Sequence, residues 1–82
     1  MSKRLAWAVL IRRQNRLDGY VASFEGTPDH PSRVLLFHTR REARAHIETR
    51  YGYLRQRPDL RREPHGWLAP IPIRVSIEVN YA

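Results

Sequence analysis

The sequence predicts a small single α+β domain over residues 1–82, with one helix packed on one face of a mostly antiparallel four-stranded sheet, in the order β-β-β-α-β. Three observations support this fold class. The segment "IPIRVSIEVNY", residues 71–81, alternates apolar and polar side chains as a half-buried strand does. Thr39 and Glu42 have the spacing of a capping box at the start of a helix. Before that helix, apolar segments alternate with turn-forming residues.

The first two strands are predicted as a hairpin. "LAWAVLIRR", residues 5–13, is rich in residues that favour strands, and "YVASFE", residues 20–25, is similar. "NRLDG" between them, with Asp18 followed by Gly19, is typical of a tight hairpin turn.

The middle of the chain predicts a loop, a short third strand and the helix. Residues 26–32, "GTPDHPS", contain a glycine and two prolines and indicate a loop. "RVLLFH", residues 33–38, is predicted as the third strand. The helix is expected from about residue 40 to 54, because one apolar stripe recurs at helical spacing, formed by Ala43, Ile47, Tyr51 and Leu54.

The last part of the chain predicts a long connection and a fourth strand. Residues 55–70 contain prolines and a glycine without periodicity, with room for one helical turn near residues 59–63. Pro72 lacks an amide hydrogen, so the final strand is expected to start at a sheet edge, and a position beside the first strand is compatible with the connection. Its alternation predicts two sets of side chains: buried Ile73, Val75, Ile77 and Val79, and exposed Arg74, Ser76 and Glu78.

Composition narrows the class of protein. The chain has no cysteine, which excludes disulfides and thiolate metal sites and fits a cytoplasmic location. The apolar run 5–11 is too short to cross a bilayer, so no membrane association is expected. A domain of 82 residues buries a modest core, and a homodimer would add buried area.

The net charge of +7 indicates a polyanionic or acidic partner. Codon bias in a GC-rich genome is an alternative reason why arginines so outnumber lysines.

The residues that could carry chemistry favour a protein that is not an enzyme. Glu42 and His46 lie four residues apart on the helix and are interpreted as an intrahelical pair, while the other histidines lie at strand ends, loops or turns. A metal site needs three or four converging ligands, and the sequence shows no such spacing. It also shows no nucleophile motif and no glycine-rich phosphate loop. No catalytic residue, metal or cofactor is therefore expected.

Arginines form the strongest functional signal. Arg40, Arg41 and Arg44 occupy the first turns of the helix, where the helix dipole favours acids, so their placement indicates a partner that supplies negative charge. Further arginines follow in the connection and at the tip of the first hairpin. The full set of candidate phosphate-contacting residues is Arg12, Arg13, Arg16, Arg33, Arg40, Arg41, Arg44, Arg55, Arg57, Arg61 and Arg62. Tyr53 and Trp67 are candidates for stacking on bases or for docking.

From about residue 7 to 51, the pieces "GYVASFE" and "LLFHTRREARAHI" resemble the three-stranded DNA-binding domains of the AP2 and phage-integrase arm-binding type. The resemblance implies a sheet face that reads DNA and nominates Arg12, Ser23, Glu25 and Arg33 for that role. The long connection and the fourth strand depart from that family's pattern. The fourth strand could cover the reading face or displace it.

Two functions remain open from the sequence. The first is a nucleic-acid-binding module of prokaryotic or phage type that contacts phosphates through its arginines, with DNA preferred over RNA as the partner. The second is a small non-catalytic adaptor or inhibitor that docks on another protein, such as one with an acidic surface, through a strand edge or the Trp67 region. Salt distinguishes them, because phosphate binding weakens steeply as salt rises.

Overall fold

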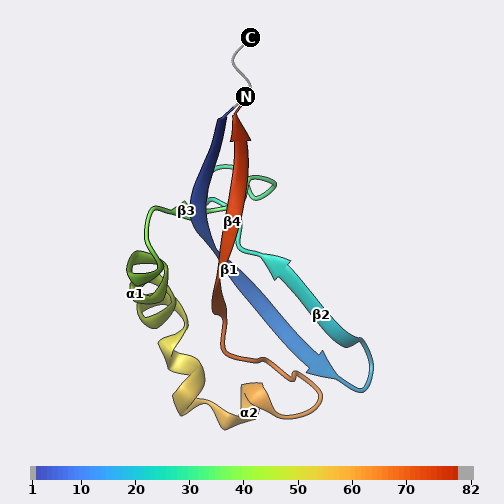
Figure 1. Cartoon of the computed structure of the whole chain (residues 1–82). Helices are drawn as coiled ribbons and strands as arrows, with labels where there is room; N and C mark the ends of the chain where they lie inside the picture. Colours follow the sequence, from blue (N-terminus) through green and yellow to red (C-terminus); the bar gives the residue numbers. More distant parts are fainter. Residues whose placement is uncertain (1, 80–82) are drawn as a thin grey trace.

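The computed structural model describes residues 2–79 and confirms the small α+β domain, a four-stranded antiparallel sheet with one long helix (Figure 1). Along the chain the elements are strands β1 (Ser2–Asn15), β2 (Gly19–Phe24) and β3 (Leu36–Phe37), helix α1 (Arg40–Tyr51), the 3₁₀ helix η1 (Gly52–Gln56), the short helix α2 (Pro58–Arg61) and strand β4 (Ile71–Val79). No described helix is long and apolar enough to cross a membrane.

Strand β1 is the centre of the sheet. Its second half pairs with β2, from Leu10 opposite Phe24 to Asn15 opposite Gly19, which confirms the predicted hairpin. Its first half pairs with β4 on the other edge, from Ser2 opposite Val79 to Leu10 opposite Ile71. The fourth strand therefore lies beside the first, and every other strand of the sheet pairs with β1.

The third strand is much shorter than predicted. The sequence predicts a strand over residues 33–38, but only Leu36 and Phe37 pair with β1. The preceding residues form an excursion instead, in which Gly26 bridges to Val34 and the Leu35 amide donates to the Glu25 carbonyl. Strands β2 and β3 thus lie one after the other along the same edge of β1, interrupted by residues 26–34.

Helix α1 begins as the sequence predicts. The Thr39 side chain accepts a hydrogen bond from the Glu42 amide at 3.1 Å, and its hydroxyl donates to the Glu42 carboxylate at 3.3 Å. The predicted helix to residue 54 is α1 up to Tyr51, followed by a tighter 3₁₀ turn.

The connection 55–70 is more ordered than a plain loop. It contains the end of η1 and helix α2, and its last part joins the sheet beside the second half of β1. The Gln14 amide donates to the Gly66 carbonyl at 2.9 Å, and the Leu68 amide donates to the Arg12 carbonyl at 3.1 Å. This segment therefore continues the edge that β4 occupies further along β1.

The helix packs on the face of the sheet opposite to the one that the sequence pattern predicts. Successive residues of a strand point to opposite faces, and residues directly across a ladder share one face. Phe37, whose ring lies 5.1 Å from that of His46 on α1, pairs with Trp7, and Trp7 pairs with Arg74. The helix face of β4 therefore carries Pro72, Arg74 and Ser76.

The apolar residues of β4 consequently lie on the uncovered face, which corrects their predicted burial. Ile73, Val75 and Ile77 are half-buried, while Arg74 and Ser76 are exposed as predicted. The side chains of Glu78 and Val79 lie outside the described residues. The core between α1 and the sheet is small, and Val9 is the only side chain larger than alanine that is fully buried among the described residues.

Candidate nucleic-acid interface

The structure separates the predicted phosphate-contacting arginines by whether each has an acidic partner within the chain. Three of them form close ion pairs: Arg13 with Asp18 at 2.8 Å, Arg55 with Glu48 at 2.6 Å and Arg57 with Asp59 at 2.9 Å. These pairs neutralise the arginines locally. In the last pair, the Arg57 guanidinium lowers the pKa of the Asp59 carboxyl below its ordinary value.

Arg12 is also engaged within the protein, by a hydrogen bond to the backbone. It is half-buried, and its guanidinium donates to the carbonyl oxygen of Ala69 at 2.8 Å, which holds the connection against β1. A guanidinium held in this way is poorly placed to reach a phosphate on the surface.

The remaining arginines are exposed and form no ion pair with any acidic side chain that the structure describes. All of them except Arg33 fall on two regions, one at the start of α1 and one near α2, at opposite ends of the helical layer (Figure 1). One contains Arg61 and Arg62 of the connection with Arg16 of the hairpin turn, which lies beside them because its amide donates to the Glu63 carboxylate at 3.1 Å. Arg33 stands apart on the excursion after β2.

The other region is the start of α1, and its members Arg40, Arg41 and Arg44 are here called the α1 arginine surface. Because Thr39 caps the helix, three cationic side chains surround the end where the backbone amides contribute partial positive charge. The Arg40 guanidinium lies 6.0 Å from the ring centroid of Trp7. Trp7 is directly opposite Arg74 on β4, so a fourth arginine, which sequence reasoning did not select, flanks this surface.

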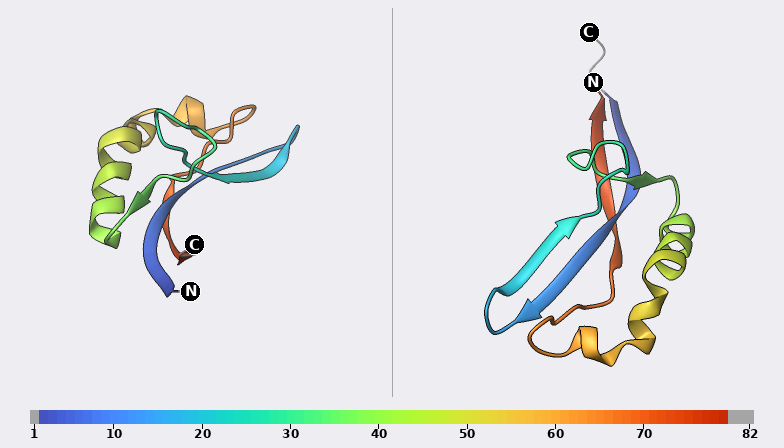
Figure 2. Two further views of the ribbon diagram at one scale, coloured as in Figure 1. Left: turned by 90° about the horizontal axis from the view of Figure 1, so that it is seen from above. Right: turned by 180° about the vertical axis from the view of Figure 1, so that it is seen from behind.

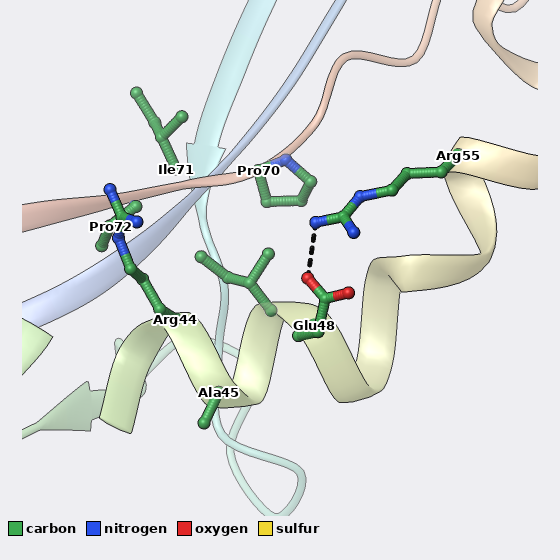
Figure 3. A pocket seen from close by; sticks show the side chains of 8 residues that line it. Arg44, Ala45, Glu48, Arg55, Pro70, Ile71 and Pro72 are labelled. Atoms are coloured by element: carbon green, nitrogen blue, oxygen red, sulfur yellow. Dashed lines mark hydrogen bonds and ion pairs between the residues drawn. The ribbon is translucent and has the colours of Figure 1, made fainter. Parts of the chain in front are cut away.

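An open groove of about 440 Å³ runs between α1 and the start of β4 (Figure 3). Arg44 reaches from the helix toward Pro72 at one end, and the Arg55–Glu48 ion pair lies at the other. The lining is otherwise mainly apolar and includes Ala45, Ile47, Pro70 and Ile71. The groove therefore adjoins the α1 arginine surface, because Arg44 belongs to both.

The candidate stacking residues differ in their surroundings. Tyr53 is 53% exposed. Trp67 is half-buried and bridges to Arg13, whose guanidinium lies 5.7 Å from the centroid of the indole ring. That contact occupies one face of the indole, so Tyr53 is the freer of the two aromatic side chains.

The residues nominated by the resemblance to three-stranded DNA-binding domains do not share one surface. Arg12 and Ser23 point to opposite faces, because Ser23 pairs with Ile11. Glu25 is 8% exposed and Arg33 lies outside the regular strands.

Sequence reasoning missed the polar cluster around Glu25. The Glu25 carboxylate lies 2.5 Å from His46 Nε2, accepts a hydrogen bond from the Tyr51 hydroxyl and lies 3.6 Å from Arg50 Nε. The predicted pairing of His46 with Glu42 is therefore wrong, since His46 turns to the sheet and Glu42 bonds to Thr39. No signal near Glu25 in the sequence indicates its burial, because the partners come from a helix twenty or more residues away.

Tyr51 makes the stability of the folded protein depend on pH in the alkaline range. Burial, together with the hydrogen bond to Glu25, raises the pKa of Tyr51 from 10.0 to about 12. Below pH 10.0 the phenol is protonated in the folded and unfolded states, and above it the unfolded chain loses the proton first. Urea unfolding should therefore show stability falling between these two pKa values, with a smaller fall in Tyr51→Phe. An identical decline in both proteins would show that Tyr51 is not the group responsible.

Among the side chains that the structure describes, no group of three or more potential metal ligands comes together. Comparisons with protein-family models, with curated proteins and with solved structures find no match for this chain.

Proposed function

We propose that this protein is a non-catalytic nucleic-acid-binding module whose α1 arginine surface contacts the phosphate backbone. The observation that carries the proposal is the contrast among its arginines. Arg40, Arg41 and Arg44 are exposed on consecutive helical turns without an acidic partner in the described chain, whereas Arg13, Arg55 and Arg57 are paired.

In the free protein, several positive charges lie close together at the start of α1. Three guanidinium groups at a helix N-terminus repel one another and the partial charge of the first-turn amides. A phosphate at this position would relieve that repulsion and accept hydrogen bonds from the guanidinium groups. Arg74 and the net charge of +7 add to the attraction. Contacts of this kind bind the backbone without reading bases, and DNA is proposed as the preferred partner.

The test is the triple variant Arg40→Ala, Arg41→Ala and Arg44→Ala, with binding to random-sequence DNA and RNA followed by fluorescence anisotropy. Affinity should fall about 100-fold, at about 1 kcal/mol for each guanidinium removed from a phosphate. The slope of log affinity against log salt should also become shallower by about 0.7 to 0.9 for each phosphate that the variant no longer neutralises.

A matched control removes the same charge from paired arginines, with Arg13→Ala, Arg55→Ala and Arg57→Ala. Their phosphate contacts would compete with the carboxylates already bound, so affinity should change only through net charge, by a small factor at moderate salt. Equal losses in the two triple variants would refute a localised site. Absence of binding by the wild type at low salt would favour the docking of an acidic protein instead.

A further inference from the structure

Three hollows adjoin one another where the end of the connection passes the helices. Seen from behind, the chain runs from α1 through η1 and α2 and then turns back to the start of β4 (Figure 2). The groove of about 440 Å³ beside α1 shares four lining residues with a smaller hollow of about 100 Å³, namely Ile47, Glu48, Arg55 and Pro70. That hollow shares three with a further one of about 160 Å³, namely Tyr51, Leu54 and Pro70. The three hollows together are here called the Pro70 seam.

The hollow of about 160 Å³ is an aromatic pocket at one end of the Pro70 seam. It brings together Tyr53 of η1 and Trp67 of the connection, and its other lining residues are Ile11, Tyr51, Leu54, Leu68 and Pro70. A site that encloses a whole drug-sized ligand has a volume of roughly 300 to 1,000 Å³. The aromatic pocket is smaller than that, so it fits one ring system that belongs to a longer molecule.

The remainder of the Pro70 seam is positively charged. Among the described residues, its charged side chains are those of three arginines and one glutamate, Arg44, Arg55, Arg61 and Glu48. Arg55 is paired with Glu48, whereas Arg44 and Arg61 form no ion pair with any acidic side chain that the structure describes. Arg44 lines the groove, and Arg61 lines the hollow next to the aromatic pocket. The complementary occupant is therefore an anion that also carries flat, largely apolar rings.

We infer that the Pro70 seam binds single-stranded nucleic acid, with phosphates at Arg44 and Arg61 and an unpaired base in the aromatic pocket beside Tyr53. A single strand carries one negative charge and one flat ring system for each nucleotide, and the seam complements both. Its bases can turn outward, whereas a duplex keeps them paired and stacked inside. Stacking on an aromatic side chain accepts any base, so the pocket confers a preference for unpaired strands without selecting a sequence.

This inference rests on the proposed function, because Arg44 belongs both to the α1 arginine surface and to the Pro70 seam. It adds the form of nucleic acid that the protein prefers. A duplex and a single strand both present phosphates to the α1 arginine surface, but only the single strand also fills the aromatic pocket. Variants of the aromatic pocket should therefore affect the two forms differently, and variants of the α1 arginine surface should affect both.

Fluorescence anisotropy tests the inference with a DNA strand of about 16 nucleotides without self-complementarity, the RNA strand of the same sequence, and the DNA duplex. Tyr53→Ala should weaken binding of both single strands about tenfold, the effect of one lost stacking contact, and leave duplex binding unchanged. Tyr53→Phe keeps the ring and should bind as the wild type does. Tyr20→Ala is the matched control, because Tyr20 is 54% exposed, against 53% for Tyr53, and lies on β2 outside the seam.

Equal single-strand affinity of Tyr53→Ala and the wild type would overturn the inference. An equal loss in Tyr20→Ala, or an equal loss for the duplex, would overturn it as well. If the triple variant of the α1 arginine surface loses binding to both forms while Tyr53→Ala loses neither, the phosphate contacts stand and the aromatic pocket is refuted. A wild type that binds neither form would refute the inference together with the proposed function.

Cross-linking tests the same contact in the unaltered protein. A DNA strand that carries 5-bromouracil in place of thymine is irradiated in the complex, and the cross-linked peptides are identified after digestion with trypsin. Cleavage after arginine places Tyr53 and Trp67 on separate peptides, residues 51–55 and 63–74. Cross-links on one or both of these peptides are expected. Cross-links confined to other peptides would contradict a base in the aromatic pocket.

Discussion

Gly66→Ala is expected to cost about 3 kcal/mol of folding stability or more. Gly66 has φ of +70°, a region that costs an L-residue energy. A Cβ atom there would lie 2.0 Å from the carbonyl oxygen of Gln14 and 2.7 Å from its carbon. Both are backbone atoms of the central strand, so the clash can be relieved only by separating the connection from β1.

Gly19→Ala separates the cost of the positive φ from the cost of the steric clash. Gly19 has φ of +69°, but an added Cβ meets nothing within 4 Å. Its cost should therefore be the conformational term alone, about 1 to 2 kcal/mol. Urea unfolding with an unchanged m value would compare the two variants directly. Similar losses of unfolding free energy in the two variants would mean that the close approach of Gly66 to β1 does not affect stability.

Glu25→Ala is expected to cost about 2 to 4 kcal/mol, because one buried carboxylate serves several partners. Without it the Tyr51 hydroxyl and the His46 ring, both partly buried against the sheet, lose their hydrogen-bond partner. The Arg50 guanidinium loses its nearest acid as well. Since these partners lie on α1, the loss should appear as weaker docking of the helix on the sheet.

Glu42→Ala is the control for the Glu25 variant. Glu42 is exposed and its carboxylate bonds only to the Thr39 hydroxyl in the described structure, so the expected cost is below about 1 kcal/mol. Thermal melts followed by near-ultraviolet circular dichroism would monitor the packing of the aromatic side chains, Tyr51 among them. If the two variants melt at the same temperature, the contacts of Glu25 do not stabilise the fold.

Local features of the sequence predicted local features of the fold. The capping box at Thr39 and Glu42 needs only neighbouring residues, and it marked the helix start correctly. The hairpin turn at Asp18 and Gly19 was predictable for the same reason. Alternation in β4 predicted a strand, since the period of two is visible in one segment.

Features that depend on distant pairing were not predictable. Alternation alone does not say which face a helix covers, so Ile73 and Val75 were expected to be buried, whereas the structure places them on the sheet face away from α1. The third strand was predicted too long, because composition does not reveal that residues 33–35 turn back toward Gly26 and Glu25.

The candidate site was predictable in residue type more than in arrangement. Arg57 lies two residues from Asp59 and Arg55 seven from Glu48, so these pairings were within reach of the sequence. The placement of Arg74 beside Trp7 depends on the register between β1 and β4, which no local pattern specifies.

The pairing of β1 with β4 also governs when the protein can fold. The first half of β1 is translated before its partner β4, which leaves the ribosome after every other described element. Until then the sheet consists of the β1–β2 hairpin and the two-residue β3, and so small a sheet gives helix α1 little to pack on, since an isolated hairpin is at best marginally stable in water. Contacts of such long sequence separation slow folding. During synthesis, the unpaired edge of β1 and its apolar residues are therefore open to other strands and to chaperones.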